Sequence, residues 1–230
     1  LADRLYLEVP LEEFQASGSS ASREENGLLT EGERLDDLLP LHMRERLKAA
    51  LSGLGIPYEA IQTQRPWLAA ITLQTVQMSK LGYSHLHGVE QILTAKAKQE
   101  GVEIRGLETA GQQFGFLGGM SAQAELAFLD SSLEQLPDTE KLIGGMVEAW
   151  RAGDQETLQR VLEESMDAQD ELSQTIFTER NQDWVGKIEG LMEQPGVFVI
   201  AVGAGHLAGP DGVPELLRQA GYKVTRSGGE

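Results

Sequence analysis

The sequence contains no cysteine among its 230 residues. This absence excludes disulfide bonds, thiolate chemistry and cysteine-ligated zinc, so any metal would depend on histidine and carboxylate ligands. The chain also lacks a run of about twenty apolar residues, the length that a membrane-spanning helix needs. It opens with Leu-Ala-Asp rather than a basic segment followed by a hydrophobic one. Any signal or anchor would therefore precede residue 1, and an extracytoplasmic or envelope-associated location would depend on such a segment.

Basic residues are scarce relative to acidic ones. The 19 lysines and arginines stand against 36 aspartates and glutamates, which gives a net charge of −17. Binding to phosphate backbones needs clustered basic side chains, so this composition argues against a nucleic-acid partner. The acidity favours solubility, and it also leaves open an interaction module whose acidic surface contacts a basic partner.

Apolar residues make up 40% of the chain, enough to bury a full core, and the length suits one domain over residues 1–230 with helical insertions at about 33–98 and 121–194. Apolar side chains recur at helical spacing through most of the sequence. This pattern predicts helices at about 35–51, 65–80, 89–100, 122–136, 139–152 and 155–192. The polar, serine-rich stretch 12–26 has the composition of a loop or mobile flap.

Strand patterns occur near both ends of the chain and at its middle. Residues 5–9 alternate apolar and other side chains, residues 102–108 follow Gly101, and a continuous apolar run begins at residue 197. The run predicts a strand buried on both faces. A short helix and another strand at 222–225 would complete a βαβ unit, and a strand is also expected near 27–30. We therefore expect an α/β fold with a small, mostly parallel sheet, flanked and capped by a larger helical layer.

Glu8, Glu108 and His206 each lie at the predicted carboxyl end of a different strand. Parallel strands bring these ends to one edge of a sheet, where ligands of open α/β folds bind. Two carboxylates and an imidazole suit a divalent metal such as zinc, manganese or cobalt. They equally suit metal-free acid–base chemistry. The alternative is a structural hydrogen-bond cluster without a ligand.

Arg180 lies on the apolar stripe of a predicted helix, between Ile176 and Trp184. A buried arginine needs an acidic partner or an anionic ligand, and Glu8 or Glu108 would serve; the alternative is that its side chain extends along the stripe to solvent. Three further groups carry weaker signals. Asn181 is expected to orient its neighbours, Gln112 and Gln113 to line the cleft beyond Glu108, and His85 and His87 to lie in a polar loop rather than in a site.

Several segments of the sequence resemble one protein family. They are Val-Gly-Ala-Gly-His-Leu at 202–207 with the following Gly-Pro-Asp-Gly, Leu-Tyr-Leu-Glu-Val at 5–9, Gly-Leu-Glu-Thr-Ala-Gly-Gln-Gln at 106–113, and Glu-Arg-Asn at 179–181. Together they resemble the TraB/PrgY/GumN family, which includes the TIKI metalloproteases and has ChaN-like and erythromycin-esterase-like relatives. The resemblance extends over nearly the whole chain.

The resemblance implies a metal-dependent hydrolase, with a peptidase as the narrower expectation. It assigns Glu8, Glu108 and His206 as metal ligands, with Glu108 alternatively a general base and Arg180 a stabiliser of a developing oxyanion. Family members also carry an upstream strand ending in Gly-x-x-His, which this sequence does not contain, and a basic residue where Gln91 follows Glu90. These departures put hydrolysis in doubt.

The pheromone-shutdown members of the family suggest a different class of function. In this alternative, the chain is a non-catalytic protein that sequesters a peptide or signal molecule in the same cleft. Its ligand would be a peptide or another small molecule, and the sequence leaves open whether the chain forms a homodimer.

Overall fold

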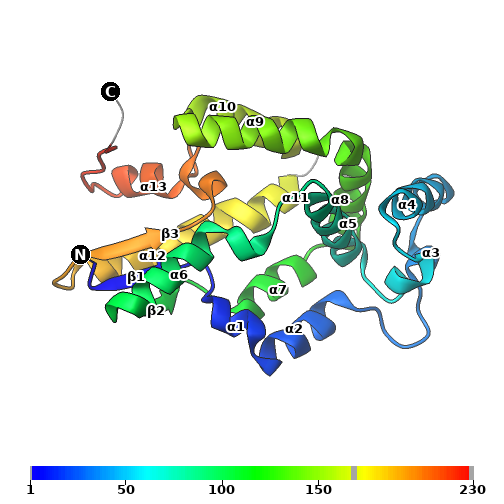
Figure 1. Ribbon diagram of the computed structural model, residues 1–230, viewed down its shortest axis with the longest axis horizontal. Coiled ribbons are helices and arrows are strands. Elements are labelled where there is room, and N and C mark those ends of the chain that lie inside the picture. Colours follow the sequence, from blue (N-terminus) through cyan, green and yellow to red (C-terminus); the bar gives the residue numbers. More distant parts are fainter. Residues whose placement is uncertain (1, 167–169, 228–230) are drawn as a thin grey trace.

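Three parallel strands lie at one end of a largely helical molecule (Figure 1). The computed structural model describes residues 2–166 and 170–227. Within these residues the sheet contains β1 (Arg4–Leu7), β2 (Glu103–Gly106) and β3 (Phe198–Ala201) in the order β2-β1-β3. Leu7 is paired with Gly106 on one side and Ala201 on the other, so the three carboxyl ends meet at one edge. The predicted α/β class, with a parallel sheet and a helical layer, is confirmed.

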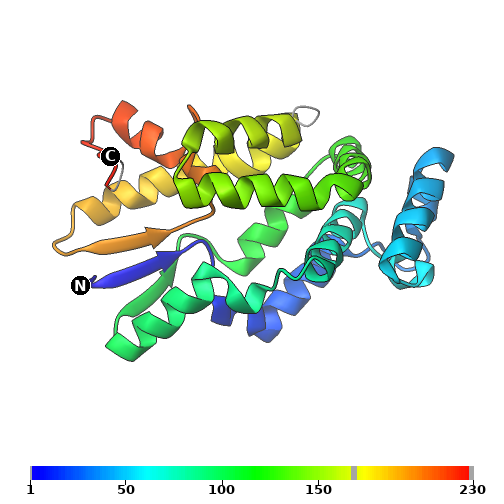
Figure 2. The same ribbon diagram turned by 45° about the horizontal axis from the view of Figure 1, so that its top comes forward.

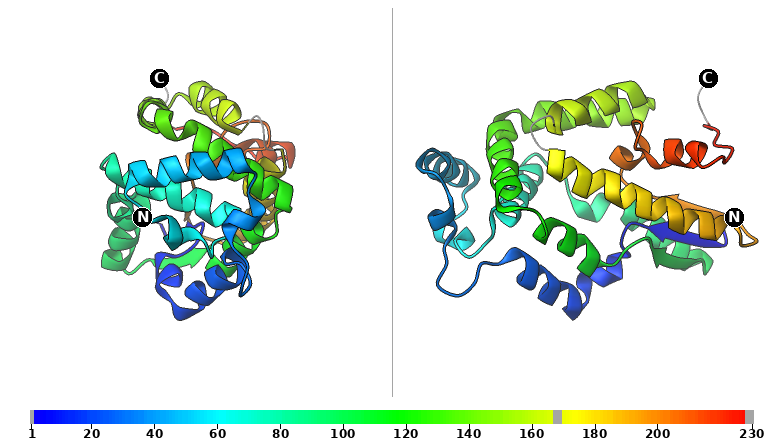
Figure 3. Two further views of the ribbon diagram at one scale, coloured as in Figure 1. Left: turned by 90° about the vertical axis from the view of Figure 1, so that its right-hand side faces the viewer. Right: turned by 180° about the vertical axis from the view of Figure 1, so that it is seen from behind.

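Helices cover both faces of this sheet. Tyr6 of β1 points to one face and packs with Trp184 of α12 (Glu179–Met192) and Leu217 of α13 (Val213–Gln219). Its neighbours Leu5 and Leu7 point to the other face, where α6 (Val89–Glu100) covers them. Figure 2 shows β1 between its two neighbours, and the rear view in Figure 3 shows α12 running alongside the strands.

The largest apolar core lies away from the sheet, among helices. It joins α4 (Leu41–Leu54), α5 (Pro66–Lys80) and α8 (Ala122–Gln135). The adjoining pair α9 (Thr139–Ala152) and α10 (Gln155–Met166) runs along the top of the molecule in Figure 1. The bounds of α5, α6, α8 and α9 match the sequence prediction closely, because each has a clear apolar period and a proline, a glycine or a capping serine at an end. None of the described helices is both long and apolar enough to cross a membrane.

The expected loop at 12–26 is helical instead. It forms α1 (Leu11–Gln15) and α2 (Ser17–Gly27), and α2 packs against α7 (Ala110–Gly118). Gly118 makes this contact close: a Cβ there would lie 2.7 Å from the Cβ of Asn26. The prediction was wrong because the composition of α2 is that of a loop, whereas its helical state depends on packing against a distant glycine-rich helix.

Two predicted strands are also corrected. Residues 27–30 contribute only an isolated antiparallel bridge between Leu28 and Gln64. Residues 222–225 form no strand, although Tyr222 and Val224 pack beside α12 and α13. In the described chain β3 therefore pairs with β1 alone, and Val199 remains 40% exposed. The expectation of a strand buried on both faces fails because Val199, the register partner of Leu5, lies on the face that α6 covers but outside the apolar cluster there.

Two long predicted helices are interrupted. The first divides into α3 (Leu35–Leu38) and α4 at Pro40. The second contains α10, α11 (Asp170–Ser173), the π-helical turn η4 (Gln174–Thr178) and α12, while residues 167–169 lie outside the described part. Short 3₁₀ turns complete the chain: η1 (Tyr58–Ile61), η2 (His85–His87), η3 (Leu136–Asp138) and η5 (Ala204–Leu207).

Candidate functional site

Arg180 lies at the centre of a buried polar group at the carboxyl edge of the sheet. Its Nε donates to both carboxylate oxygens of Glu108, at 2.9 and 3.2 Å, and its Nη2 donates to Oε2 of Glu8 at 2.8 Å. A further bond joins Nη2 to Glu108 Oε1. The side chains of Arg180 and Glu108 are 7% and 1% exposed, and that of Glu8 is 25% exposed. The sequence suggested a partner at Glu8 or Glu108, and the structure provides both.

The sheet places the two carboxylates side by side. Glu8 and Glu108 follow β1 and β2, and the pairing continues past the strands through Glu108 N–H donating to Glu8 O at 2.9 Å. The backbone N–H of Gly203, after β3, donates to Oε1 of Glu8 at 2.7 Å. A Cβ at residue 203 would lie 3.3 Å from that oxygen, so glycine permits the close approach. All three strand ends thus contribute to one cluster.

His206 joins the cluster from η5 with its imidazole buried. Its Nδ1 lies 2.6 Å from Oδ1 of Asn181, whose Nδ2 donates to the carbonyl of Asp211 at 2.7 Å. The Asp211 carbonyl fixes the orientation of the Asn181 amide, so Nδ1 carries the proton and Nε2 carries the lone pair. That Nε2 lies 3.4 Å from Arg180 Nη1 and 3.9 Å from Glu8 Oε1. We call Glu8, Glu108, Arg180 and His206 the Arg180 cluster.

Aromatic rings enclose the imidazole. The ring centroids of Trp184 and Phe177 lie 4.3 and 4.9 Å from that of His206, and the Arg180 guanidinium lies 4.8 Å from the Trp184 centroid. Burial lowers the pKa of His206 to about 4, with Glu8 acting in the opposite direction and Arg180 adding to the decrease. The imidazole is therefore neutral at neutral pH. Burial likewise raises the pKa of the Glu108 carboxyl, and Arg180 opposes this rise.

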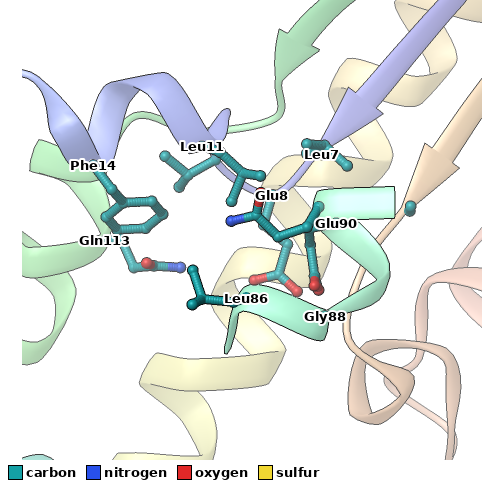
Figure 4. A pocket seen from close by; sticks show the side chains of 11 residues that line it. Leu7, Glu8, Leu11, Phe14, Leu86, Gly88, Glu90 and Gln113 are labelled. Atoms are coloured by element: carbon teal, nitrogen blue, oxygen red, sulfur yellow. The ribbon is translucent and has the colours of Figure 1, made fainter. Parts of the chain in front are cut away.

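A cavity of about 500 Å³ opens beside Glu8 (Figure 4). Its polar lining includes Glu8, Glu90, Gln91 and Gln113, and its apolar lining includes Phe14. We call it the Glu8 cavity. Gln113 occupies the position expected from the sequence, because its side chain points toward the cavity in Figure 4. Gln112 does not line this cavity: its side chain accepts from the backbone of Thr109 and caps α7.

The geometry does not favour the predicted metal site at Glu8, Glu108 and His206. The described residues contain no group of three or more His, Asp or Glu side chains arranged to hold a metal ion. Arg180 supplies the positive charge for Glu8 and Glu108, and its Nη1 faces the lone pair of His206. The arrangement does not fit a three-ligand metal centre, and the metal role of these residues stays a prediction.

Sequence reasoning missed several parts of the cluster. The ring of Trp184 was read only as part of an apolar stripe, although it contacts both His206 and Arg180. Its spacing of four residues from Arg180 was the available signal. The backbone groups of Gly203 and Asp211 carry no side-chain signal at all. Among the histidines read as outside the site, the side chain of His85 lies outside the described part, and His87 lines a different groove beside α5.

Comparison with known proteins supports the family resemblance seen in the sequence. Residues 1–226 match the model of the TraB/PrgY/gumN family. The chain belongs to this family. It is 28% identical to the uncharacterized protein YbaP of Escherichia coli over 186 residues, covering 81% of this chain and 69% of that protein. An uncharacterized protein of Treponema pallidum is 24% identical over 95% of this chain and 69% of its own length. No solved structure matches. Membership in the TraB/PrgY/gumN family confirms the resemblance, while these relatives bring no assigned activity.

Proposed function

We propose that this TraB/PrgY/gumN protein is a peptide hydrolase whose polar centre is the Arg180 cluster. One observation carries the proposal: a buried neutral imidazole, held in one tautomer by Asn181, directs its lone pair toward the Arg180 guanidinium, which pairs with the Glu8 carboxylate at a cavity. Perturbed titratable groups that converge beside a cavity are typical of catalytic centres.

The geometry suggests a division of roles. Glu8 is the most exposed member and lines the Glu8 cavity, so it is the carboxylate placed to meet a substrate or its attacking water. Glu108 is held on both oxygens by Arg180 and is buried, which favours a positioning role over that of a free general base. The N–H groups of Arg180 already face acceptors, so Arg180 would stabilise negative charge that develops on the substrate through its positive charge and not through a direct hydrogen bond. With a pKa of about 4, His206 is a weak base at neutral pH, and its lone pair faces Arg180 Nη1 at 3.4 Å.

A divalent metal remains part of the proposal as an option that needs a ligand beyond this cluster. The Nε2 of His206 and a carboxylate oxygen of Glu8 are the two donors with the correct protonation, and the ion would supply Lewis-acid activation of water or a carbonyl. We expect zinc or manganese to bind weakly to the 230-residue chain. Calorimetric titration tests this: tight binding that survives His206→Ala would rule out His206 as a ligand.

Cleavage of a defined peptide mixture, followed by mass spectrometry with and without added zinc or manganese, tests hydrolysis. Loss of a positioned acid–base group typically costs about 10²- to 10⁴-fold in rate, so Glu8→Gln should show a loss of this order. Arg46→Ala, in a half-exposed ion pair with Asp130 of α8, is a control that should retain full activity. Cleavage that is unchanged in Glu8→Gln would overturn the proposal.

A second candidate is peptide sequestration without turnover. It is favoured by the saturation of the carboxylates: Glu108 is held by Arg180 on both oxygens, and the oxygens of Glu8 accept from Arg180 and Gly203. A protein of this kind would retain intact peptide at equilibrium. Peptides that co-purify unchanged through gel filtration, and that never yield fragments even with metal, would support sequestration over hydrolysis.

A further inference from the structure

A second cavity adjoins the Arg180 cluster on the side away from the sheet. Its volume is about 400 Å³, within the range of roughly 300–1,000 Å³ that ligand pockets occupy. Six apolar side chains dominate its wall: Ile71, Phe114, Phe116, Leu117, Phe128 and Ile176. Five of them are only partly buried, so the cavity leaves apolar surface that the protein's own core does not cover. We call it the apolar cavity.

This cavity and the Arg180 cluster share residues. Arg180 itself lines the apolar cavity, and its Nη1 donates to the carbonyl of Ile176 at 3.0 Å. Gln113 lines both the apolar cavity and the Glu8 cavity. Thr175 and Ile176 belong to the π-helical turn η4, and such wide turns recur at functional sites. A ligand held at Glu8 therefore has an apolar recess directly beside it.

The charges around the apolar cavity indicate which chemical class of ligand it can bind. Arg180 already directs its N–H groups to two carboxylates, a backbone carbonyl and the Nε2 of His206, so it has no free N–H donor for an anionic ligand in this cavity. Gln74, another polar group on the wall, donates its amide to Ser132 at 2.9 Å. What remains is an uncharged wall with three phenylalanine rings and three aliphatic side chains, which favours an uncharged apolar group over a phosphate or carboxylate.

We propose that the apolar cavity receives a bulky apolar side chain, a phenyl ring or a branched alkyl group, of a peptide whose backbone lies against Glu8 and His206. This proposal rests on the proposed peptide function of the Arg180 cluster and assigns its side-chain preference. The cavity would act as the specificity pocket, and the Glu8 cavity would take the adjoining part of the peptide.

Binding of a fluorinated probe tests the proposal without requiring catalysis. The probe is N-acetyl-4-fluorophenylalaninamide, followed by its ¹⁹F line width, and N-acetylglycinamide is the competitor that lacks a side chain. Full burial of a phenyl ring is worth about 2 kcal/mol, so the ring should improve affinity by about thirtyfold over glycinamide. Equal affinity of the two compounds would overturn the proposal.

Thr175→Phe places a ring in the cavity, and Thr75→Phe adds the same ring on the exposed face of α5, in a neighbouring groove. We expect Thr175→Phe to lose the preference for the fluorinated probe and Thr75→Phe to keep it. If a folded Thr175→Phe protein still prefers the fluorinated probe over N-acetylglycinamide, the ring of the probe binds elsewhere and the assignment is overturned. If this variant does not fold, Thr175→Leu and Ile71→Phe narrow the same cavity and carry the same expectation.

The outcomes separate this proposal from the proposed hydrolase. A strong phenyl preference with no cleavage of any peptide would support the apolar pocket and count against hydrolysis. Cleavage that depends on Glu8 but shows no difference between phenylalanine- and glycine-containing peptides would support the hydrolase and overturn the pocket.

Discussion

Within the described residues, two arginine–glutamate pairs have a deeply buried carboxylate, and they lie in different surroundings. In the helical layer, Arg65 at the start of α5 pairs with Glu125 of α8, and its Nη1 also donates to the carbonyl of Asn26 at 3.0 Å. At the sheet edge, Arg180 pairs with Glu8 and Glu108. The buried carboxylates, Glu125 and Glu108, are similarly inaccessible, at 4% and 1% exposed.

What surrounds each pair decides its role. The Asn26 carbonyl also accepts from Trp67 Nε1 at 3.1 Å, so the Arg65 pair joins α2, α5 and α8 around one backbone group. This is the arrangement of a structural cross-link. The Arg180 cluster instead adds an imidazole, a second carboxylate that reaches a cavity, and an apolar cavity on its far side. Burial of an ion pair alone does not mark a functional site; convergence of titratable groups on a cavity does.

The largest expected effect is a difference in the free energy of unfolding between the Arg180→Ala and Arg65→Ala proteins. Arg180→Ala leaves Glu8 and Glu108 without their shared cation, and breaking a buried pair costs about 3 to 5 kcal/mol. Arg65→Ala should cost less, because the Arg65 side chain is 25% exposed and water can approach Glu125 once it is removed. Urea unfolding at pH 7 measures both. An Arg180→Ala protein as stable as Arg65→Ala would remove the distinction between the pairs.

The next effect concerns pH, because only the Arg180 cluster contains a histidine. Burial holds the pKa of His206 at about 4, whereas an unfolded histidine has 6.5. The folded protein disfavours protonation, so this contribution is complete above pH 6.5 and is lost as pH falls toward 4. Its full size is about 3 kcal/mol at about 1.36 kcal/mol per unit.

The difference in unfolding free energy between the parent and His206→Gln, measured from pH 7 to pH 4, isolates this contribution. Burial raises the pKa of Glu108 and of Glu125, which makes stability fall as pH rises, but both carboxyls remain in parent and variant. His42→Gln on the exposed face of α4 is the control. Parallel stability curves for the parent and His206→Gln would contradict the buried neutral imidazole.

A smaller difference in stability is expected between substitutions of Asn181, beside the Arg180 cluster, and of Asn26, beside the Arg65 pair. Asn181→Leu leaves the buried Nδ1–H of His206 without its acceptor, which should cost about 1 to 3 kcal/mol and release the fixed tautomer. Asn26→Ala should cost less, because Asn26 serves Arg65 through its backbone carbonyl, which the substitution keeps. Denaturation measures the stabilities, and ¹⁵N spectra of His206 report the tautomer. An unchanged tautomer in Asn181→Leu would show that another group fixes it.

The smallest effect is expected at a half-exposed pair. Arg46 and Asp130 join α4 to α8 with side chains 39% and 42% exposed. Solvent screening limits such pairs to about 0.2 to 1 kcal/mol. Thermal melting of Arg46→Ala at low and high salt checks this value. A loss as large as that of Arg180→Ala would mean that burial does not set the order of these effects.

Much of the site was predictable from the order of residues. Glu8, Glu108 and His206 follow strands that pair in parallel, so their convergence follows from the shared direction of the strands. Arg180 on an apolar stripe needed an acidic partner, because an unpaired buried cation is costly. Helices with a sustained apolar period and a clear end, such as α6 and α9, were likewise fixed by local chemistry.

Other features depended on contacts between distant parts of the chain. The helical state of α2 follows from its packing on the glycines of α7, and the incomplete pairing of β3 follows from where residues 222–225 lie. The tautomer of His206 depends on the Asp211 carbonyl, and the apolar cavity depends on how α5, α7, α8 and η4 meet. Sequence determined which residues carry charge and which faces are apolar, because these are properties of each side chain and its period. Only tertiary structure decided which polar groups are satisfied and where space remains, because both depend on atoms brought together from separate segments.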